Sequence, residues 1–274
     1  MKLALSNLAI PSCSDIFYLN ALRDSGLLGI EVAPTRLAPW DQIRPATIQK
    51  YRQMVSAVGL EIPSLQAIFF GLGHLQLLSD ASNFVKMLEH WRFVCAIGVD
   101  LGAKIAVFGA PRNRNRGDLE SELAWTLARE RLYEMGEVAK ETGFSIGLEP
   151  VPRDYGGDFL TQAVDVIQMV REIGHSAIRV HIDTACALLS GDSVATAISE
   201  SEKLLAHFHA SEPKLSLFDN PQCDHVGAAS ALKKLRYDKW VSIEMLEPTG
   251  DSLQSIRQAI GFCTKIYSCD DGKN

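Results

Sequence analysis

FSIGLEP, at residues 144–150, is a short apolar run that ends in a carboxylate. The same pattern recurs three times further along the chain, in IRVHIDT (178–184), AHFHAS (206–211) and WVSIEM (240–245). The ionisable residues near the ends of these runs follow one another at intervals of 34, 26 and 35 residues and are Glu149, Asp183, His209 and Glu244. Each interval is about the length of one strand plus one helix, so the pattern predicts parallel strands joined by helices.

The alternation of short strands and longer helical stretches runs through the whole chain. Helical periodicity is clearest at 81–98, 119–142, 161–173 and 252–267, with Asp80 and Asp118 near expected helix starts and Gly98, Gly143 and Gly174 at expected helix ends. Eight strands are expected: Lys2–Ser6, Gly29–Ala33, Glu61–Ala67, Lys104–Gly109, Phe144–Glu149, Ile178–Asp183, Ala206–His209 and Trp240–Met245. The repeat predicts a (β/α)8 TIM barrel, a single domain over residues 1–274 with a frayed polar tail at 268–274.

A doubly wound open sheet is the main alternative fold. That fold usually carries a glycine-rich turn after its first strand, and the segment NLAI at residues 7–10 contains no glycine. We therefore favour the barrel.

Composition narrows the class of partner. The chain has 27 basic and 33 acidic residues and a net charge of −6, which disfavours a large nucleic-acid footprint. The apolar start is too short for a signal-peptide core, and no apolar run approaches the roughly 18 residues of a membrane span. Six cysteines without CxxC spacing indicate reduced thiols. We expect a cytoplasmic protein that binds neither membrane nor nucleic acid.

The four ionisable residues of the opening pattern would meet in a barrel, because side chains at the carboxyl ends of the strands gather at one rim. Three carboxylates and a neutral imidazole carry about three negative charges, which repel one another strongly without a cation. Oxygen and imidazole ligands suit Mn²⁺, Mg²⁺, Co²⁺ or Zn²⁺. Glu149, Asp183, His209 and Glu244 therefore predict one divalent-metal site. The alternative is that each residue caps a helix or forms a separate ion pair.

Longer segments around these residues resemble a known family. LEPVPR (148–153), HIDTACAL (181–188), HFHASEP (207–213) and DHVGAASALKKLRYDKWVSIEM (224–245) are similar to the sugar phosphate isomerase/epimerase superfamily, whose xylose isomerase-like TIM barrels include endonuclease IV and the ketohexose 3-epimerases. The resemblance covers essentially the whole chain and is most specific in its second half. It implies that the four residues bind one divalent metal, and that Glu149 and Glu244 exchange a proton next to a carbonyl through an enediolate.

Three positions depart from the ketohexose 3-epimerase pattern. That branch typically has a Glu, a His and an Arg where this chain has Tyr155, Cys186 and Leu215. The resemblance thus implies an isomerase or epimerase of a sugar or sugar phosphate, without implying ketohexose specificity, and family relatives are often dimers or tetramers. A sugar dehydratase or lyase and a sugar-binding barrel without turnover stay open. An endonuclease IV-like phosphodiester hydrolase is disfavoured by the acidic balance and by only seven histidines.

Five further residues are candidates for binding substrate: His225, Arg112, Glu31, Gln66 and Lys214. Arg112 lies in PRNRNR (111–116), a loop that could bind phosphate or carboxylate. The alternatives are a solvated loop paired with Asp118 and Glu120, a surface His225 beside a helix-capping Asp224, and an ion pair of Glu31 with Arg36. The loop 69–74 (FFGLGH) is expected to be either a lid or part of the core.

Overall fold

The structure, a computed structural model, describes residues 1–12 and 15–268. Eight parallel strands form one sheet in the order β2-β1-β8-β7-β6-β5-β4-β3. The strands are β1 (Lys2–Ser6), β2 (Gly29–Glu31), β3 (Ser64–Leu65), β4 (Ile105–Phe108), β5 (Ser145–Leu148), β6 (Ile178–Asp183), β7 (Leu205–Ser211) and β8 (Trp240–Glu244). Two isolated parallel bridges, Gly29–Glu61 and Val32–Leu65, join β2 to the segment around β3 and close the barrel. The predicted TIM barrel is confirmed.

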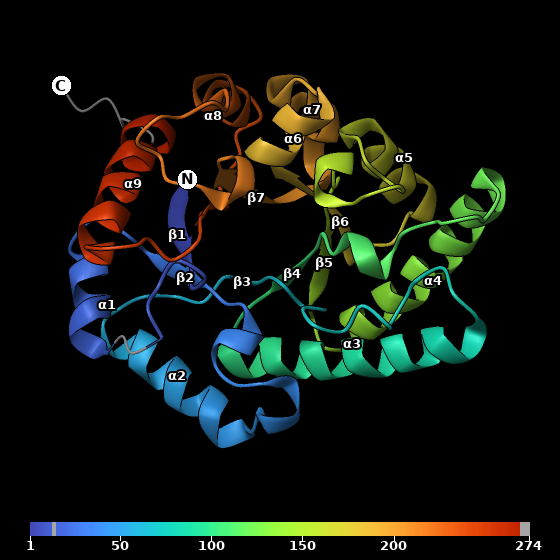
Figure 1. Ribbon diagram of the computed structural model, residues 1–274, viewed down its shortest axis with the longest axis horizontal. Helices are drawn as coiled ribbons and strands as arrows, with labels where there is room; N and C mark the ends of the chain where they lie inside the picture. Colours follow the sequence, from blue (N-terminus) through green and yellow to red (C-terminus); the bar gives the residue numbers. More distant parts are fainter. Residues whose placement is uncertain (13–14, 269–274) are drawn as a thin grey trace.

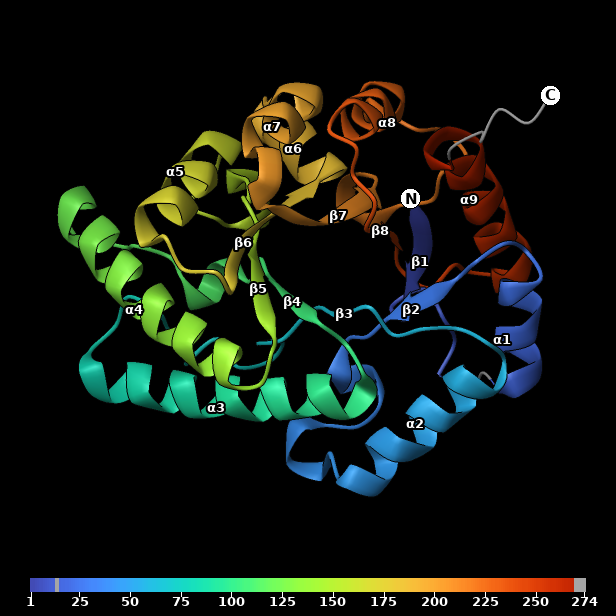
Figure 2. The same ribbon diagram turned by 180° about the vertical axis from the view of Figure 1, so that it is seen from behind.

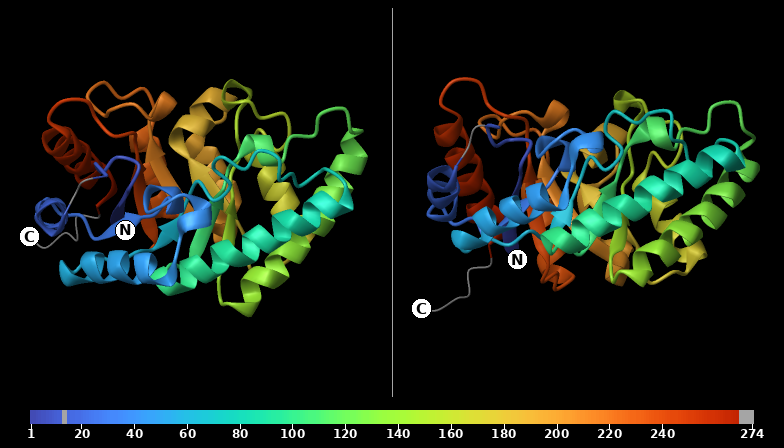
Figure 3. Two further views of the ribbon diagram at one scale, coloured as in Figure 1. Left: turned by 60° about the horizontal axis from the view of Figure 1, so that its bottom comes forward. Right: turned by 90° about the horizontal axis from the view of Figure 1, so that it is seen from below.

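Helices form a ring around the strands (Figures 1 and 2). They are α1 (Ile16–Arg23), α2 (Pro45–Ala57), α3 (Ala81–Leu101), α4 (Ser121–Glu141), α5 (Ala163–Ile173), α6 (Thr184–Ser190), α7 (Val194–Ser201), α8 (His225–Lys234) and α9 (Ser252–Tyr267). In side view, α4 and α9 lie at opposite ends of the molecule (Figure 3). Within the described ranges, no helix combines the length and apolar character that a bilayer crossing requires.

Strand register sets the level of the ionisable residues. Asp183 of β6 is paired with His209 of β7, and Ser211 of β7 is paired with Glu244 of β8. Glu149 follows the last residue of β5 directly. The carboxyl ends of β5 to β8 therefore present these side chains at nearly the same height along the barrel.

Helix ends agree with the sequence predictions in part. Asp80 caps α3 by accepting from the Asn83 N–H, and Gly174 caps α5 with φ of 61°. The prediction that Gly98 ends a helix was wrong, whereas Asp118 lies near a helix start as expected but is not its cap. Helix α3 continues to Leu101, because Gly102, with φ of 88°, supplies the left-handed turn that ends it. Helix α4 begins at Ser121 with Glu120 as its N-cap.

The predicted third strand, Glu61–Ala67, is reduced to Ser64–Leu65. Four cysteines of the described residues are free and buried, as expected for reduced thiols: Cys95, Cys186, Cys223 and Cys263. The expected frayed tail at 268–274 lies outside the described residues except for Ser268, which follows α9.

Candidate metal centre

Four side chains converge at the carboxyl ends of β5 to β8. The His209 Nδ1 atom lies 3.2 Å from Glu244 Oε2 and 3.8 Å from Asp183 Oδ2. Potential ligand atoms of Glu149, Asp183 and His209 all lie within 4.8 Å of one another. Metal–ligand bonds of about 2.0–2.2 Å place neighbouring ligand atoms at such separations. The structure thus brings together the four residues singled out by their spacing.

Electrostatics favour a cation at this point. Burial, with the neighbouring charges of Asp183 and Glu244, raises the pKa of Glu149 to about 8. Burial and Glu244 also raise the pKa of Asp183. Burial alone would lower the pKa of His209, but the charges of Glu31 and Glu244 outweigh it and raise that pKa well above its usual value. The cluster therefore takes up protons where a divalent ion would relieve the same repulsion, so the donor set fits a metal.

Asp183 is fixed by two bonds. Its Oδ1 accepts from the Cys186 N–H at 2.6 Å, which makes Asp183 the N-cap of α6, and its Oδ2 accepts from the Ser211 hydroxyl at 2.5 Å. Capping had been the alternative to metal binding for this residue. The structure shows that the cap and the convergence occur together, because the capped carboxylate still faces His209.

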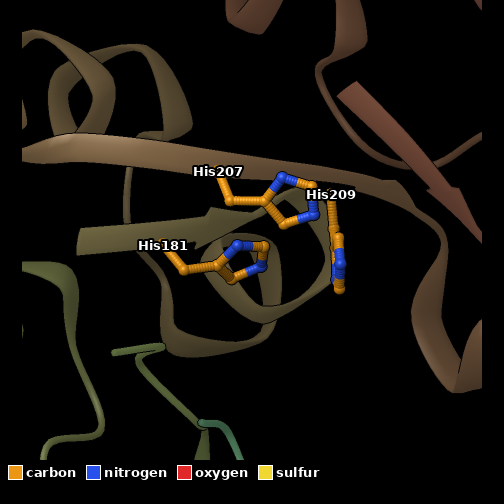
Figure 4. Close-up of side chains that lie close together, drawn as sticks. All are labelled: His181, His207 and His209. Carbon is orange, nitrogen blue, oxygen red and sulfur yellow. The ribbon is translucent and has the colours of Figure 1, made fainter. Parts of the chain in front are cut away.

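Three imidazoles lie together below this rim. His207 and His209 project from β7, and His181 projects from neighbouring β6 (Figure 4). The ring centroids of His181 and His209 are 4.2 Å apart, and His181 Nε2 lies 3.6 Å from Glu149 Oε1. Both His181 ring nitrogens are buried without a hydrogen-bond partner among the described residues. The sequence did not single out His181 and His207, although each stands two residues before a predicted ligand and so faces the same side of its strand.

Glu31 lies beneath His209 and is fully buried. Its Oε1 lies 2.8 Å from His209 Nε2, and its Oε2 lies 2.5 Å from His207 Nε2. Burial alone would raise the pKa of Glu31, but His209 and His207 hold it well below its usual value. The expected alternative pairing with Arg36 does not form in the described structure, because Arg36 pairs with Glu247 at 3.0 Å.

A cavity of about 560 Å³ opens beside the four converging residues. Glu149, His209 and Glu244 line it together with Gln66 and Arg112. Over the described residues, its lining includes none of Glu31, Lys214 and His225. The cavity offers room for a small polar molecule next to the carboxylates.

The two phenylalanines of the loop 69–74 differ in exposure, and the lid remains a prediction. Phe69 is buried and packs against Phe108 with ring centroids 5.1 Å apart. Phe70 is 69% exposed and lines the cavity with Gly71 and Gly73. One phenylalanine therefore anchors the loop and the next forms part of the cavity wall.

The arginines of the 111–116 loop have separate environments. Arg112 is exposed at the cavity. Arg114 is fully buried and donates to the main-chain oxygens of Phe108 and Glu149. The Arg116 side chain donates to the Leu119 carbonyl, so the expected pairing with Asp118 and Glu120 is not seen among the described residues. Arg112 is the arginine of this loop that lines the cavity.

The remaining sequence candidates lie around the site. Gln66 donates to the Ser6 hydroxyl at the cavity floor. His225 is buried, against the alternative of a surface position, and lies 2.8 Å from Glu212 and 2.7 Å from the Tyr267 hydroxyl. Asp224 beside it caps α8, as that alternative expected. Lys214 is exposed, and its backbone has φ of 60°.

One of the departing positions, Cys186, contacts a residue of the site, and a second, Tyr155, joins two nearby loops. The Cys186 thiol lies 3.8 Å from Glu149 Oε1. The Tyr155 hydroxyl accepts from the Lys214 N–H at 2.7 Å, and burial raises the pKa of Tyr155 to about 12. Tyr155 therefore ties the loop after β5 to the loop after β7.

A (β/α)8 barrel with carboxylates and an imidazole gathered at the carboxyl ends of its strands defines a class of TIM-barrel proteins with a candidate metal centre. A family model described as xylose isomerase-like TIM barrel matches residues 19–266, and the chain belongs to that family. A search of curated protein sequences finds no match.

Solved structures share the fold across almost the whole chain. A D-psicose 3-epimerase studied in the presence of D-fructose is 16% identical with a TM-score of 0.83, over 98% of this chain and 100% of that one. A 3-keto-D-glucoside 4-epimerase from E. coli is 17% identical with a TM-score of 0.81, over 97% and 99%. An IolI protein with a binding zinc atom is 15% identical with a TM-score of 0.75, over 98% and 100%. At these identities the likeness establishes the fold.

Proposed function

We propose that this chain is a divalent-metal-dependent isomerase or epimerase that moves a proton next to the carbonyl of a sugar or sugar derivative. The observation that carries the proposal is the convergence of three carboxylates and one imidazole beside a cavity of about 560 Å³. Glu149, Asp183, His209 and Glu244 would hold the cation. The fold shared with sugar epimerases supports the same reaction class.

The bound cation would supply a positive charge that stabilises negative charge developing on the carbonyl oxygen. Glu149 and Glu244 would carry the proton. They end strands β5 and β8, which are separated by β6 and β7, and both line the cavity, so they reach a bound sugar from different sides.

The groups that line the cavity and those beside Glu149 are compatible with a carboxylate that carries a proton. Phe70 and the glycines beside it form part of the cavity wall. The Cys186 thiol lies 3.8 Å and His181 Nε2 lies 3.6 Å from Glu149 Oε1, and both are uncharged when the thiol is protonated and the imidazole neutral.

The buried free thiols of the described residues support the expected cytoplasmic setting, because a reducing compartment keeps them unpaired.

Metal binding and solvent exchange test the proposal together. We expect the purified chain to bind about one divalent ion, and Glu244→Gln to weaken Co²⁺ affinity at least about tenfold by removing a ligand charge. Glu247→Gln is the matched control, since that carboxylate pairs with Arg36 outside the converging set. In deuterated water, the metal-loaded chain should place deuterium on the carbon next to the carbonyl of a substrate ketose.

Two results would reject the proposal: no divalent ion on the wild-type chain, or Glu244→Gln with unchanged metal affinity and activity. Loss of water from the sugar in the same experiment would instead identify a dehydratase.

Arg112 bears on whether the substrate is charged. Its guanidinium is exposed at the cavity, and no ion pair of it is seen within residues 1–12 and 15–268. A charge-assisted hydrogen bond contributes about 1.5–3 kcal/mol, so Arg112→Ala should raise KM for a phosphorylated or carboxylated sugar roughly 10- to 100-fold. KM for a neutral sugar of the same skeleton should not change. An unchanged KM for the anionic sugar would exclude this role.

A further inference from the structure

We infer that Glu31 and His207 form a buried unit that positions His209 for the cation. The inference rests on the proposed metal centre and adds two residues that touch neither the cavity nor the expected cation position. In the sequence, Glu31 was a candidate for contacting substrate. In the barrel it contacts His209 instead, on the side of the ring away from Asp183 and Glu244.

His209 contacts carboxylates through both ring nitrogens. Nδ1 faces Glu244 and Asp183, at 3.2 and 3.8 Å, and Nε2 faces Glu31 Oε1 at 2.8 Å. A neutral imidazole carries one proton, and a carboxylate accepts but does not donate. With the proton on Nε2, toward Glu31, the Nδ1 lone pair points at the position where Glu244 and Asp183 would share a cation. Metal-binding histidines commonly use such a carboxylate to fix the tautomer and the ring.

His209 Nε2 lies 2.8 Å from Glu31 Oε1, but the orientation of the ring does not give this contact hydrogen-bond geometry. The His209 ring therefore sits at a distance where a small rotation would complete the bond.

Glu31 is itself held in place from several strands. Its Oε2 accepts from the Ser64 hydroxyl of β3 at 2.5 Å and contacts His207 Nε2 of β7 at 2.5 Å. The Ser242 hydroxyl of β8 lies 3.2 Å from that same histidine nitrogen. Glu31 has no exposed surface, so its carboxylate stays on the barrel axis beneath His209. Strands β2, β3, β7 and β8 thus combine to fix one imidazole.

The three-histidine cluster admits another assignment, a second metal held by His181, His207 and His209. The positioning role fits better, because His207 Nε2 is already engaged by Glu31 and Ser242. The two assignments differ in stoichiometry: one divalent ion per chain for positioning, two for a second site.

The test is Co²⁺ binding to the Glu31→Gln variant. Calorimetry measures the affinity, and the visible absorption of the bound ion reports its coordination. We expect about 10- to 100-fold weaker binding, the usual effect of losing an outer partner of a metal ligand, and a changed visible spectrum. Glu212→Gln is the matched control. It removes an equally buried carboxylate that lies 2.8 Å from His225, so it should lower stability in a similar way while Co²⁺ affinity stays within about twofold.

Glu31→Asp covers the case in which Glu31→Gln does not fold. Aspartate keeps the negative charge but its side chain is one methylene shorter. The Co²⁺ affinity of this variant should therefore lie between those of the wild type and the Gln variant. Equal affinity for the wild type and a folded Glu31 variant would overturn the inference while leaving the metal centre in place. Two ions per chain would also overturn it if both remain bound to Glu212→Gln, because Glu212, Cys223 and His225 form another group that could hold an ion. A wild-type chain that binds no ion would remove the proposed function as well.

Discussion

His209 links the rim of the barrel to its interior. Through Nδ1 it faces Asp183 and Glu244, and through Nε2 it faces Glu31. The sequence predicted the first set of neighbours, because one strand–helix unit separates each residue from the next. It could not predict the second, because whether the last residue of a short strand points to the rim or to the axis depends on strand tilt and register.

The same limit applies to His225 and to the arginine loop. His225 follows a capping Asp224, and local pattern alone leaves its direction open; the packing of α8 on α9 turns it inward to the Tyr267 hydroxyl. The 111–116 loop was expected either to bind an anion or to be solvated, yet Arg114 is buried and donates to main-chain oxygens. Unpaired carbonyls of a folded loop are not visible in a sequence.

Proton release should accompany metal binding. Burial, with Asp183 and Glu244, raises the pKa of Glu149 to about 8, and the charges of Glu31 and Glu244 hold the pKa of His209 well above its usual value despite burial. Below these values the metal-free groups are protonated, so a cation must displace protons and its affinity must rise with pH. We expect release of at least about one proton near pH 6.5 and fewer near pH 9.

Calorimetry of Co²⁺ binding in buffers of different ionisation enthalpy measures this release. Heats that do not depend on the buffer near pH 6.5 would contradict the prediction. Glu149→Gln should reduce the number of protons released, because one of the titrating groups is then absent.

At the scale of elements, the sequence predicted helix ends correctly where a residue caps the helix next to it in the sequence. Asp80 and Gly174 cap α3 and α5 as the sequence predicted. Gly98 was misassigned as a helix end because a glycine inside a helix can also be required for close packing against a residue distant in the sequence. A Cβ on Gly98 would lie 2.5 Å from the Phe144 ring, so the glycine lets α3 approach the residue that precedes β5.

Two glycines inside helices should therefore respond oppositely to alanine. Gly98→Ala gains helix propensity, about 1 kcal/mol, but must displace the buried Phe144 ring at a cost of about 1–3 kcal/mol. Gly261→Ala in α9 meets nothing within 4 Å among the described residues and should stabilise by up to about 1 kcal/mol. Urea unfolding of both variants measures the difference. Equal stabilisation by the two would contradict the packing argument.

At the scale of the whole molecule, the eight-fold repeat was sufficient to predict the barrel, because each repeat adds one parallel strand and one covering helix. Closure was less visible in the sequence. The predicted seven-residue third strand is reduced to two paired residues, and isolated bridges complete the joint with β2. Barrel closure needs few hydrogen bonds at one joint when the other seven pairs of neighbouring strands are joined by ladders, although the β6–β7 ladder contains a register shift.

The position of the metal centre relative to that seam gives a prediction for the whole barrel. A cation would cross-link the ends of β5 to β8, opposite the β2–β3 joint, and Glu31 would carry the effect to β2 through His209. Free ligand at about 100 times Kd stabilises the native state by about 2.7 kcal/mol. At short exchange times, which report local opening, Co²⁺ should slow amide hydrogen exchange in segments 149–155, 183–190 and 209–215, and to a smaller degree in 29–33.

Exchange in α2 and α3 should change least at those times, because neither helix contributes a residue to the lining of the cavity. Glu244→Gln should lose the whole pattern, whereas Glu31→Gln should lose the protection of 29–33 first, since that segment reaches the cation only through the Glu31–His209 contact. Protection spread evenly over the barrel, or confined to segments distant from β5 to β8, would contradict a cation bound by Glu149, Asp183, His209 and Glu244.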